Sequence, residues 1–273
     1  MDFYTCEEIS KRVVRIKSAI GEYMYLVKGN TKAALIDAGT GFGYLDKVVA
    51  TYTDLPVEVY ATHAHIDHIG GAFYYDNIHY HKADGEIWEE NIQYAKRADY
   101  IALCTSENAK SITDTLVQPK QLLKIYIEEG ELIDLGGATL EVIETPGHTR
   151  GSVCFFLREE GILFSGDACN PRSFLFLPES IGIKSYMKTL TKLIRRSGDF
   201  KRILNGHDAG ELPRDIFYNV LECCVDILNQ TDEHVPFAFM DKTAYAAHAI
   251  LGESNRWDGV VGNVIYDENR VLE

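Results

Sequence analysis

The sequence predicts an α+β fold made of two similar halves, with sheets packed inward and helices outside, in a single domain. A β-β-α-β pattern appears twice, around residues 23–61 and 139–204. Strand-like runs outnumber helical runs early in each half, and the chain contains no internal repeat, low-complexity tract or obvious linker. Helices on the outer faces of sheets bury the apolar side of each element, so this pattern favours one layered domain.

The first half is rich in strands. Short apolar or β-branched runs cover residues 13–16, 23–27, 33–36 and 57–61. Residues 37–41 form a turn after the third run, and residues 44–53 fit a helix. Gly39, Gly41 and Gly43 lack the G-x-G-x-x-G spacing of a dinucleotide-binding loop, so we interpret them as turn residues.

A short strand at 78–81 precedes a segment of different character. Residues 82–118 are mostly helical in pattern and are predicted to form an insertion. Strand-like runs then cover residues 122–127, 131–134, 139–144, 152–157, 162–164 and 202–204. Helices fit 185–196 and 213–229, the second with Pro at its start, where a missing N–H does little harm. A C-terminal extension over about 211–273 ends in a strand-like run at 260–266.

Composition narrows the class of partner. The chain of 273 residues has 41 acidic and 27 basic side chains and a net charge of −14. A general nucleic-acid-binding surface needs clustered Lys and Arg, so nucleic acid is not expected as a partner. A small molecule is expected, and an anionic one is compatible because bound metal ions set the local field of a site.

Cysteine usage and hydropathy indicate the compartment. The six cysteines form no C-x-x-C pair, so we expect reduced thiols in a cytoplasmic protein. The first residues lack the basic and apolar regions of a signal peptide. No apolar run approaches the roughly 20 residues of a membrane helix, so no membrane partner is expected. Formation of a homo-oligomer is left open.

Three histidines and a carboxylate crowd into six residues after the run 57–61. His63 and His65 are two apart, so in an extended segment their rings point to the same side. Asp67 and His68 follow where a helix could begin, and the glycines at 70–71 would let that turn pack closely. Clustered His and Asp is typical of a metal centre. One segment cannot place all four side chains on one tetrahedral ion, so two adjacent ions fit better.

Further candidates lie in short loops beside strands. His148, Asp167 and His207 sit in such loops, and Asp37 directly follows the run 33–36. Strand-end loops commonly display functional side chains on a rigid frame. Each residue alone fits a turn or cap, but together with the first cluster they supply enough ligands for two metal sites. A half-buried strand explains the second H-x-H, at 79–81, better than metal ligation does.

The order of these motifs resembles the metallo-β-lactamase-fold hydrolase superfamily. The matching motifs are Leu35-Ile36-Asp37-x-Gly39, His63-x-His65-x-Asp67-His68, Pro146-Gly147-His148-Thr149, Ser165-Gly166-Asp167 and Gly206-His207. They span roughly residues 12–210 in the family's order. The resemblance implies a four-layer αββα sandwich, which agrees with the two-half pattern. It also favours the glyoxalase II-like and lactonase-like branches.

The resemblance implies a ligand set, position by position. His63, His65 and His148 would hold a first metal, and Asp67, His68 and His207 a second, with Asp167 bridging both. Asp37 would orient a ligand, a common need of metal-bound imidazole. Nitrogen and oxygen ligands suit two divalent ions, zinc first, with iron or manganese as alternatives.

The resemblance also implies a reaction. A hydroxide bridging the two metals would attack the carbonyl of an ester, thioester or lactone. Asp67 and Asp167 would be catalytic, orienting the nucleophile and passing a proton to the leaving group. An iron-dependent oxidoreductase of persulfide dioxygenase type, or a phosphodiesterase of the same superfamily, is the alternative.

Overall fold

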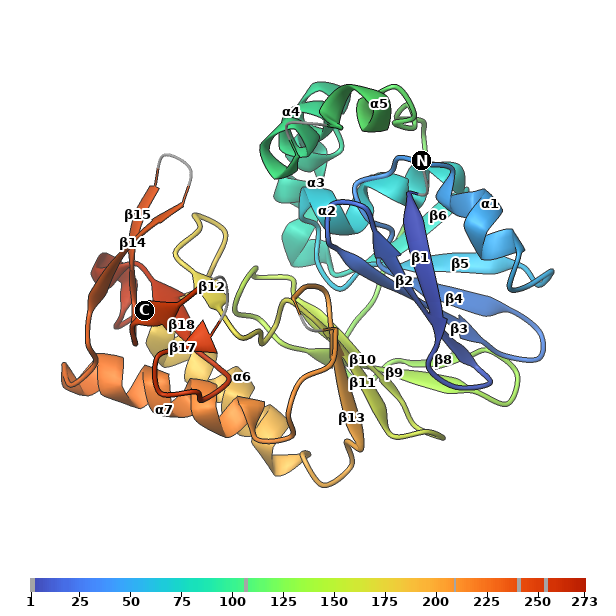
Figure 1. The fold of residues 1–273 in the computed structure, drawn as a ribbon. Coiled ribbons are helices and arrows are strands. Elements are labelled where there is room, and N and C mark those ends of the chain that lie inside the picture. Colours follow the sequence, from blue (N-terminus) through green and yellow to red (C-terminus); the bar gives the residue numbers. More distant parts are fainter. Residues whose placement is uncertain (1–2, 106–107, 209, 240–241, 253–254) are drawn as a thin grey trace. The chain divides into compact units, whose positions relative to one another are not determined.

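The computed structural model describes residues 3–105, 108–208, 210–239, 242–252 and 255–273. The chain divides into two compact units (Figure 1). The first, here the N-terminal unit, is Met1–Ile143 with Phe155–Glu159, and the second, the C-terminal unit, is Glu144–Cys154 with Glu160–Glu273. The predicted single domain with an insertion and an extension stays a prediction.

A seven-stranded sheet forms the frame of the N-terminal unit. Its order is β1-β2-β3-β4-β5-β6-β7, antiparallel through β4 and parallel from there to β7. The strands are β1 (Tyr4–Glu8), β2 (Val13–Ser18), β3 (Tyr23–Lys28), β4 (Ala33–Ile36), β5 (Val57–Tyr60), β6 (Asn77–Tyr80) and β7 (Leu123–Tyr126). β4 is buried along its whole length. Runs without polar alternation are typical of strands covered on both faces.

Helices of the N-terminal unit follow its strands. They are α1 (Leu45–Ala50), α2 (Ile66–Ile69), η1 (Gly70–Tyr74), η2 (Lys82–Asp84), α3 (Gly85–Asn91), α4 (Tyr94–Cys104) and α5 (Ala109–Thr113). The described part of the predicted insertion is therefore helical. Its Trp88 is buried and stacks on Tyr80 of β6, with ring centroids 5.2 Å apart, so the insertion shares the core of the sheet. An antiparallel pair, β8 (Leu132–Asp134) and β9 (Thr139–Glu144), follows.

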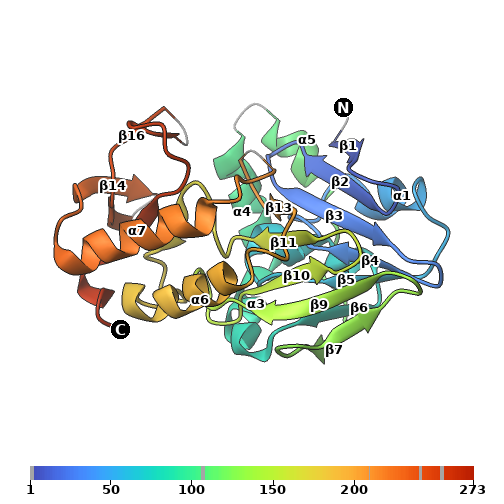
Figure 2. The same cartoon turned by 90° about the horizontal axis from the view of Figure 1, so that it is seen from below.

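The C-terminal unit combines strands with two long helices. β11 (Ile162–Gly166) pairs in parallel with β13 (Arg202–Asn205). β10 (Val153–Leu157) precedes them in the chain and is buried throughout, and its residues from Phe155 on belong to the N-terminal unit. α6 (Ile183–Arg195) and α7 (Ile216–Asn229) lie side by side (Figure 2). A four-stranded sheet has the order β12-β18-β15-β14. Its strands are β12 (Ser173–Leu175), β18 (Val264–Tyr266), β15 (Lys242–Ala246) and β14 (Val235–Phe239).

A phenylalanine cluster fills the four-stranded sheet. Phe174 of β12 packs against Phe176, Phe237 and Phe239, with ring centroids 5.2–5.9 Å from its own. Edge-on contacts at these separations are favourable for aromatic rings. The rings belong to a small core that also contains Ala244, Ala246 and Ile265. The other elements of this unit are a hairpin of β16 (Ile250–Leu251) with β17 (Asn255–Arg256), and η3 (Glu268–Arg270).

The structure adds strands that the sequence did not predict, namely β1, β12 and β14 to β17. β14 contains Pro236, which argues against a central strand because proline has no N–H to donate. It is the edge strand of its sheet, where one missing donor is tolerated. The predicted strands and helices elsewhere agree with the structure to within a few residues at their ends.

The sequence analysis expected reduced cysteines and no membrane-spanning helix. The six cysteines all lie in the described ranges, and none forms a disulfide. Among the described residues, no helix has the length and apolar character needed to cross a bilayer.

Candidate metal centre

The histidine-rich loop of the N-terminal unit starts where β5 ends. β4 and β5 run parallel, so the loops that follow them emerge at the same edge of the sheet, which brings Asp37 beside residues 61–65. α2 then begins at Ile66, as the sequence predicted. His63 and His68 are fully buried, and Asp67 keeps only 8% of its surface exposed. The loop thus carries its polar groups inside the protein.

The four side chains of this loop gather in one place. His63 Nε2 lies 3.0 Å from His65 Nδ1, and the rings of His63 and His68 have centroids 4.0 Å apart. His68 Nε2 lies 3.9 Å from Asp67 Oδ1. Two nitrogens bound to one tetrahedral zinc at 2.0–2.1 Å would be about 3.3 Å apart. The His63–His65 spacing therefore fits a shared ion.

Asp37 fixes the orientation of this loop. Its Oδ1 accepts the backbone N–H of Thr62 at 2.7 Å, and its Oδ2 accepts Nδ1–H of His68 at 2.8 Å. Since the carboxylate accepts, Nδ1 carries the proton and Nε2 of His68 keeps its lone pair for a metal. The Thr62 hydroxyl donates to Oδ2 at 2.8 Å and lies 3.1 Å from Nδ1 of His63, which leaves Nε2 of that ring available as well.

Replacing Asp37 by asparagine is expected to weaken metal binding by about 10–100-fold. Asp37 has a left-handed backbone with φ 58°, which asparagine tolerates, so the fold should survive. The amide cannot accept from His68 and Thr62 as the carboxylate does. Metal affinity measured by chelator competition checks this. Asp134→Asn is the control, because Asp134 also accepts a backbone N–H, at 2.7 Å, in the β8–β9 turn. Equal affinities would contradict the orienting role.

The helical insertion contributes contacts that sequence reasoning missed. Tyr100 of α4 donates its hydroxyl to Asp67 Oδ2 at 2.7 Å, and Asp84 accepts the backbone N–H of Ala64 at 2.9 Å. Burial, reinforced by the nearby charge of Asp67, raises the pKa of Tyr100 well above its usual value. Tyr100 lies three residues after buried Arg97 and one before buried Ile101, so the helical period was a signal that it faces inward.

Tyr100→Phe is expected to reduce metal affinity at the Asp67 position by about 10–100-fold, because Asp67 loses the donor that holds its second oxygen. Tyr94→Phe supplies a matched control on the same helix, since the Tyr94 hydroxyl donates to the carbonyl of Thr113 at 3.3 Å instead. Titration of both variants with Co²⁺, followed by absorbance, would measure the change. An unchanged Co²⁺ affinity in Tyr100→Phe would remove Tyr100 from the centre.

The histidine-rich loop packs closely against the backbone of residues 38–40. A Cβ atom added to Gly70 would lie 2.0 Å from the carbonyl oxygen of Thr40, and one added to Gly71 would lie 2.2 Å from that of Ala38. The prediction that these glycines allow close packing is therefore confirmed. Buried Arg97 spans the junction by donating to the carbonyls of Thr40, Gly70 and Val117 at 2.7–3.3 Å. Burial lowers the pKa of Arg97 to about 10.

The C-terminal unit gathers the other three predicted ligands. Asp167 follows β11 and His207 follows β13, and these strands pair in parallel, so both loops leave the same edge. His207 Nε2 lies 3.4 Å and His148 Nε2 lies 3.7 Å from the same oxygen, Oδ2 of Asp167. His148 Nδ1 donates to the carbonyl of Phe174 at 2.9 Å, which again leaves Nε2 for a metal.

α6 holds the loops that carry two of these ligands. Tyr186 donates its hydroxyl to the carbonyl of Ala168 at 2.5 Å, next to Asp167. Thr189 donates to the carbonyl of Pro146 at 2.6 Å, two residues before His148. A Cβ on Gly147 would lie 2.5 Å from the Tyr186 ring, so the loop needs glycine here. The buried face of α6 therefore serves as the support of this ligand group.

The donor chemistry fits divalent metal. All seven predicted ligands are among the described side chains that could hold a metal ion. The set consists of imidazole nitrogens and carboxylate oxygens without a thiolate, which suits zinc and also iron or manganese. In the second H-x-H, His79 lies in β6 and stacks on Tyr60, as predicted. The prediction that His81 also lies in the strand is wrong, because β6 ends at Tyr80 and His81 accepts from the N–H of Ala83 at the start of η2.

Comparisons with known proteins show the family of the chain. The family model described as the metallo-beta-lactamase superfamily matches residues 20–207. The chain is 30% identical over 205 residues to the acyl-coenzyme A thioesterase MBLAC2 of Bos taurus, covering 67% of this chain and 72% of that protein. It is 26% identical over 198 residues to the atrochrysone carboxyl ACP thioesterase AacuM of Aspergillus aculeatus, covering 68% of this chain and 53% of that protein.

Solved structures show the same fold. A metallo-beta-lactamase from Pontibacter korlensis matches with a TM-score of 0.61 at 18% identity, covering 80% of this chain and 97% of that chain. The predicted α+β fold class, the αββα sandwich of this family, is confirmed. The predicted enzyme class, a metal-dependent hydrolase, is confirmed as well. The chain belongs to the metallo-β-lactamase superfamily.

Proposed function

We propose that the protein is a dinuclear metal-dependent hydrolase that acts on a small-molecule thioester. The observation that carries the proposal is that each unit, by itself, already groups its share of the predicted ligands. In both units a protein acceptor holds Nδ1 of a histidine, His68 or His148, and so presents Nε2. Support for a thioester comes from the relatives, two of which are named thioesterases.

The ligand assignment follows from the resemblance. His63, His65 and His148 would hold one ion. Asp67, His68 and His207 would hold the other, and Asp167 would be shared. When bound, a pair of divalent ions supplies Lewis-acid polarisation of a carbonyl and lowers the pKa of water to near neutrality. Zinc is the proposed metal, with iron or manganese as alternatives.

Two carboxylates of the chain, Asp67 and Asp167, would transfer the proton of the attacking water. Asp67 and Asp167 would accept a hydrogen bond from the attacking water and hold its proton for the leaving group. A thiol has a pKa near 8.5, so a thiolate leaves with little help from an acid. An alkoxide is far more basic than a thiolate and depends more on proton transfer, so a thioester is the easier substrate for a site whose proton carriers are two carboxylates. Activity on esters and lactones stays a prediction, as does a cytoplasmic location.

A substrate panel with metal analysis tests the proposal. The purified chain would be loaded with Zn²⁺, assayed for bound metal, and given an acyl-coenzyme A, the matching alkyl ester, a lactone and bis-p-nitrophenyl phosphate. We expect about two ions per chain and the highest kcat/KM with the thioester. Chelation should abolish turnover and Zn²⁺ should restore it.

Other outcomes identify the alternatives. A single iron per chain with oxygen uptake on a persulfide would favour the oxidoreductase, and preferred turnover of the phosphate diester would favour the phosphodiesterase. A metal-loaded chain that leaves every thioester intact would overturn the proposal.

A further inference from the structure

We propose that one face of α6 binds the phosphate groups of a nucleotide-bearing thioester such as an acyl-coenzyme A. This inference rests on the proposed function and adds the location of a substrate-binding surface. Five cations make up this face, here called the basic face: Lys184, Lys188, Lys192, Arg195 and Arg196.

The basic face is unusual for this chain. α6 contains no Asp or Glu, whereas the whole protein carries a net charge of −14. At 3.6 residues per turn the five cations fall within roughly one third of the helix circumference, along about 18 Å of its length. Lys184, Lys188 and Arg195 are exposed, and none of the three forms an ion pair with another described residue. The positive charge of these three side chains is therefore accessible, whereas Arg196 is paired with Asp199, whose Oδ2 lies 3.3 Å from its Nε.

The helix alone does not explain this arrangement. Cations are favourable in the last turn, where they oppose the helix dipole, so Arg195 needs no partner. Lys184 is the second residue of α6, where the dipole disfavours a cation. Lys184 and Lys188 stand four residues apart, and like charges at that spacing repel. A bound anion would remove this repulsion.

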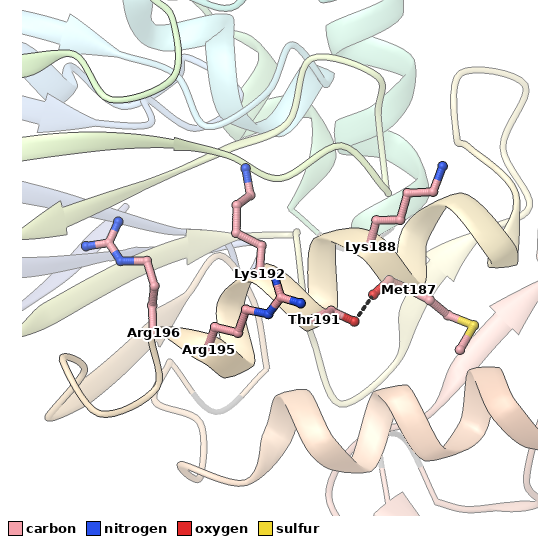
Figure 3. A pocket seen from close by; sticks show the side chains of 6 residues that line it. All are labelled: Met187, Lys188, Thr191, Lys192, Arg195 and Arg196. Carbon is pink, nitrogen blue, oxygen red and sulfur yellow. Dashed lines mark hydrogen bonds between the residues drawn. The ribbon is translucent and has the colours of Figure 1, made fainter.

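A hollow on the same face suits a nucleotide. It has a volume of about 530 Å³, and Figure 3 shows Lys188 and Lys192 extending to the same side of the helix, with Arg195 and Arg196 further along. Guanidinium groups bind phosphate oxygens in pairs, and lysines add point charges. Met187 supplies an adaptable apolar surface on which a base can pack.

The same helix supports the ligand loops of the C-terminal unit. Its buried face donates through Tyr186 and Thr189 to the backbone beside Asp167 and His148. Arg195 follows Thr189 by six residues, so this end of the basic face lies about 9 Å along the helix from the contact. Coenzyme A carries its phosphates at the end of an extended arm, away from the thioester. A phosphate site displaced along α6 from the ligands matches that separation.

Direct binding tests the proposal without relying on catalysis. Adenosine 3′,5′-bisphosphate would be titrated into the protein by calorimetry, with inorganic phosphate in a parallel titration. The test variant is Lys188→Glu/Arg195→Glu. The control is Lys201→Glu/Arg214→Glu, which makes the same charge change at two exposed positions of the same unit outside α6. We expect the test variant to weaken bisphosphate binding at least tenfold, and the control to stay within about twofold of the parent protein.

Catalysis gives the second readout. An acyl-coenzyme A and an N-acetylcysteamine thioester with the same acyl group share the reacting bond, but only the first has phosphates. The test variant should raise KM at least tenfold for the first, with kcat unchanged, and leave kcat/KM for the second unaltered. Equal losses on both thioesters, no loss on either, or bisphosphate binding that the test variant retains would overturn the proposal. If neither thioester is cleaved, the proposed function fails and calorimetry still decides the anion site.

Discussion

Replacing His65 by alanine is expected to abolish hydrolysis and to lower the metal content of the purified protein. Groups that merely orient a metal ligand cost about 10–100-fold when removed, so loss of a direct ligand should cost more than a hundredfold in kcat/KM. His65 Nδ1 lies 3.0 Å from His63 Nε2, so the His65→Ala substitution removes the imidazole nitrogen that lies beside His63. Metal content by mass spectrometry and turnover of a thioester check both effects.

The second H-x-H of the chain provides the control for this experiment. His81→Ala removes an imidazole that accepts the N–H of Ala83 at the start of η2, outside the ligand group. It should keep its metal and nearly all of its activity. If His65→Ala retains full turnover, or if both variants lose metal alike, the assignment of His65 as a ligand is wrong.

Gly70→Ala is expected to destabilise the N-terminal unit and to disable the site together. The new Cβ would lie 2.0 Å from the Thr40 carbonyl oxygen, and backbone cannot move aside as a side chain can. Overpacking of this kind typically costs about 1–3 kcal/mol. The strain falls on the loop that carries His68, whose carbonyl accepts the N–H of Ala38 at 2.7 Å. Urea denaturation and thioester turnover measure the two losses.

Gly85→Ala separates this effect from a general cost of alanine. Nothing lies within 4 Å of a Cβ built on Gly85, which begins α3 with an ordinary helical φ of −59°. Its free energy of unfolding should stay the same or rise by up to about 1 kcal/mol, because alanine restricts the unfolded chain. A Gly70→Ala protein that keeps its stability and activity would contradict the close contact between Gly70 and the Thr40 carbonyl.

The candidate ligands could be proposed from the sequence because their signals are local. Four of them lie within six residues, and Asp167 and His207 come within two residues of the ends of strands whose parallel pairing brings the two loops together. The contacts that support these ligands could not be predicted in the same way. Tyr100 reaches Asp67 across 33 residues, and His148 finds its partner in the carbonyl of Phe174, a group that every residue has. Such pairings are set by tertiary packing.

The helices and strands also divide into those with a local sequence signal and those that depend on tertiary contacts. Helix α7 was predicted from its apolar period and a proline near its start, both local features. β1 (Tyr4–Glu8) has no apolar run of its own and is ordered by pairing with β2, so its sequence carries little signal. Edge strands depend on a neighbour in this way, and β14 with its proline is the second example.

Phe174 takes part both in orienting His148 and in packing the aromatic cluster. Its carbonyl accepts from His148, while its ring packs among Phe176 and, from the C-terminal extension, Phe237 and Phe239. A mutation that moves Phe174 in this aromatic cluster is therefore expected to shift the imidazole of His148 as well. Under the proposed ligand assignment, repacking this cluster would change ion affinity at the same time.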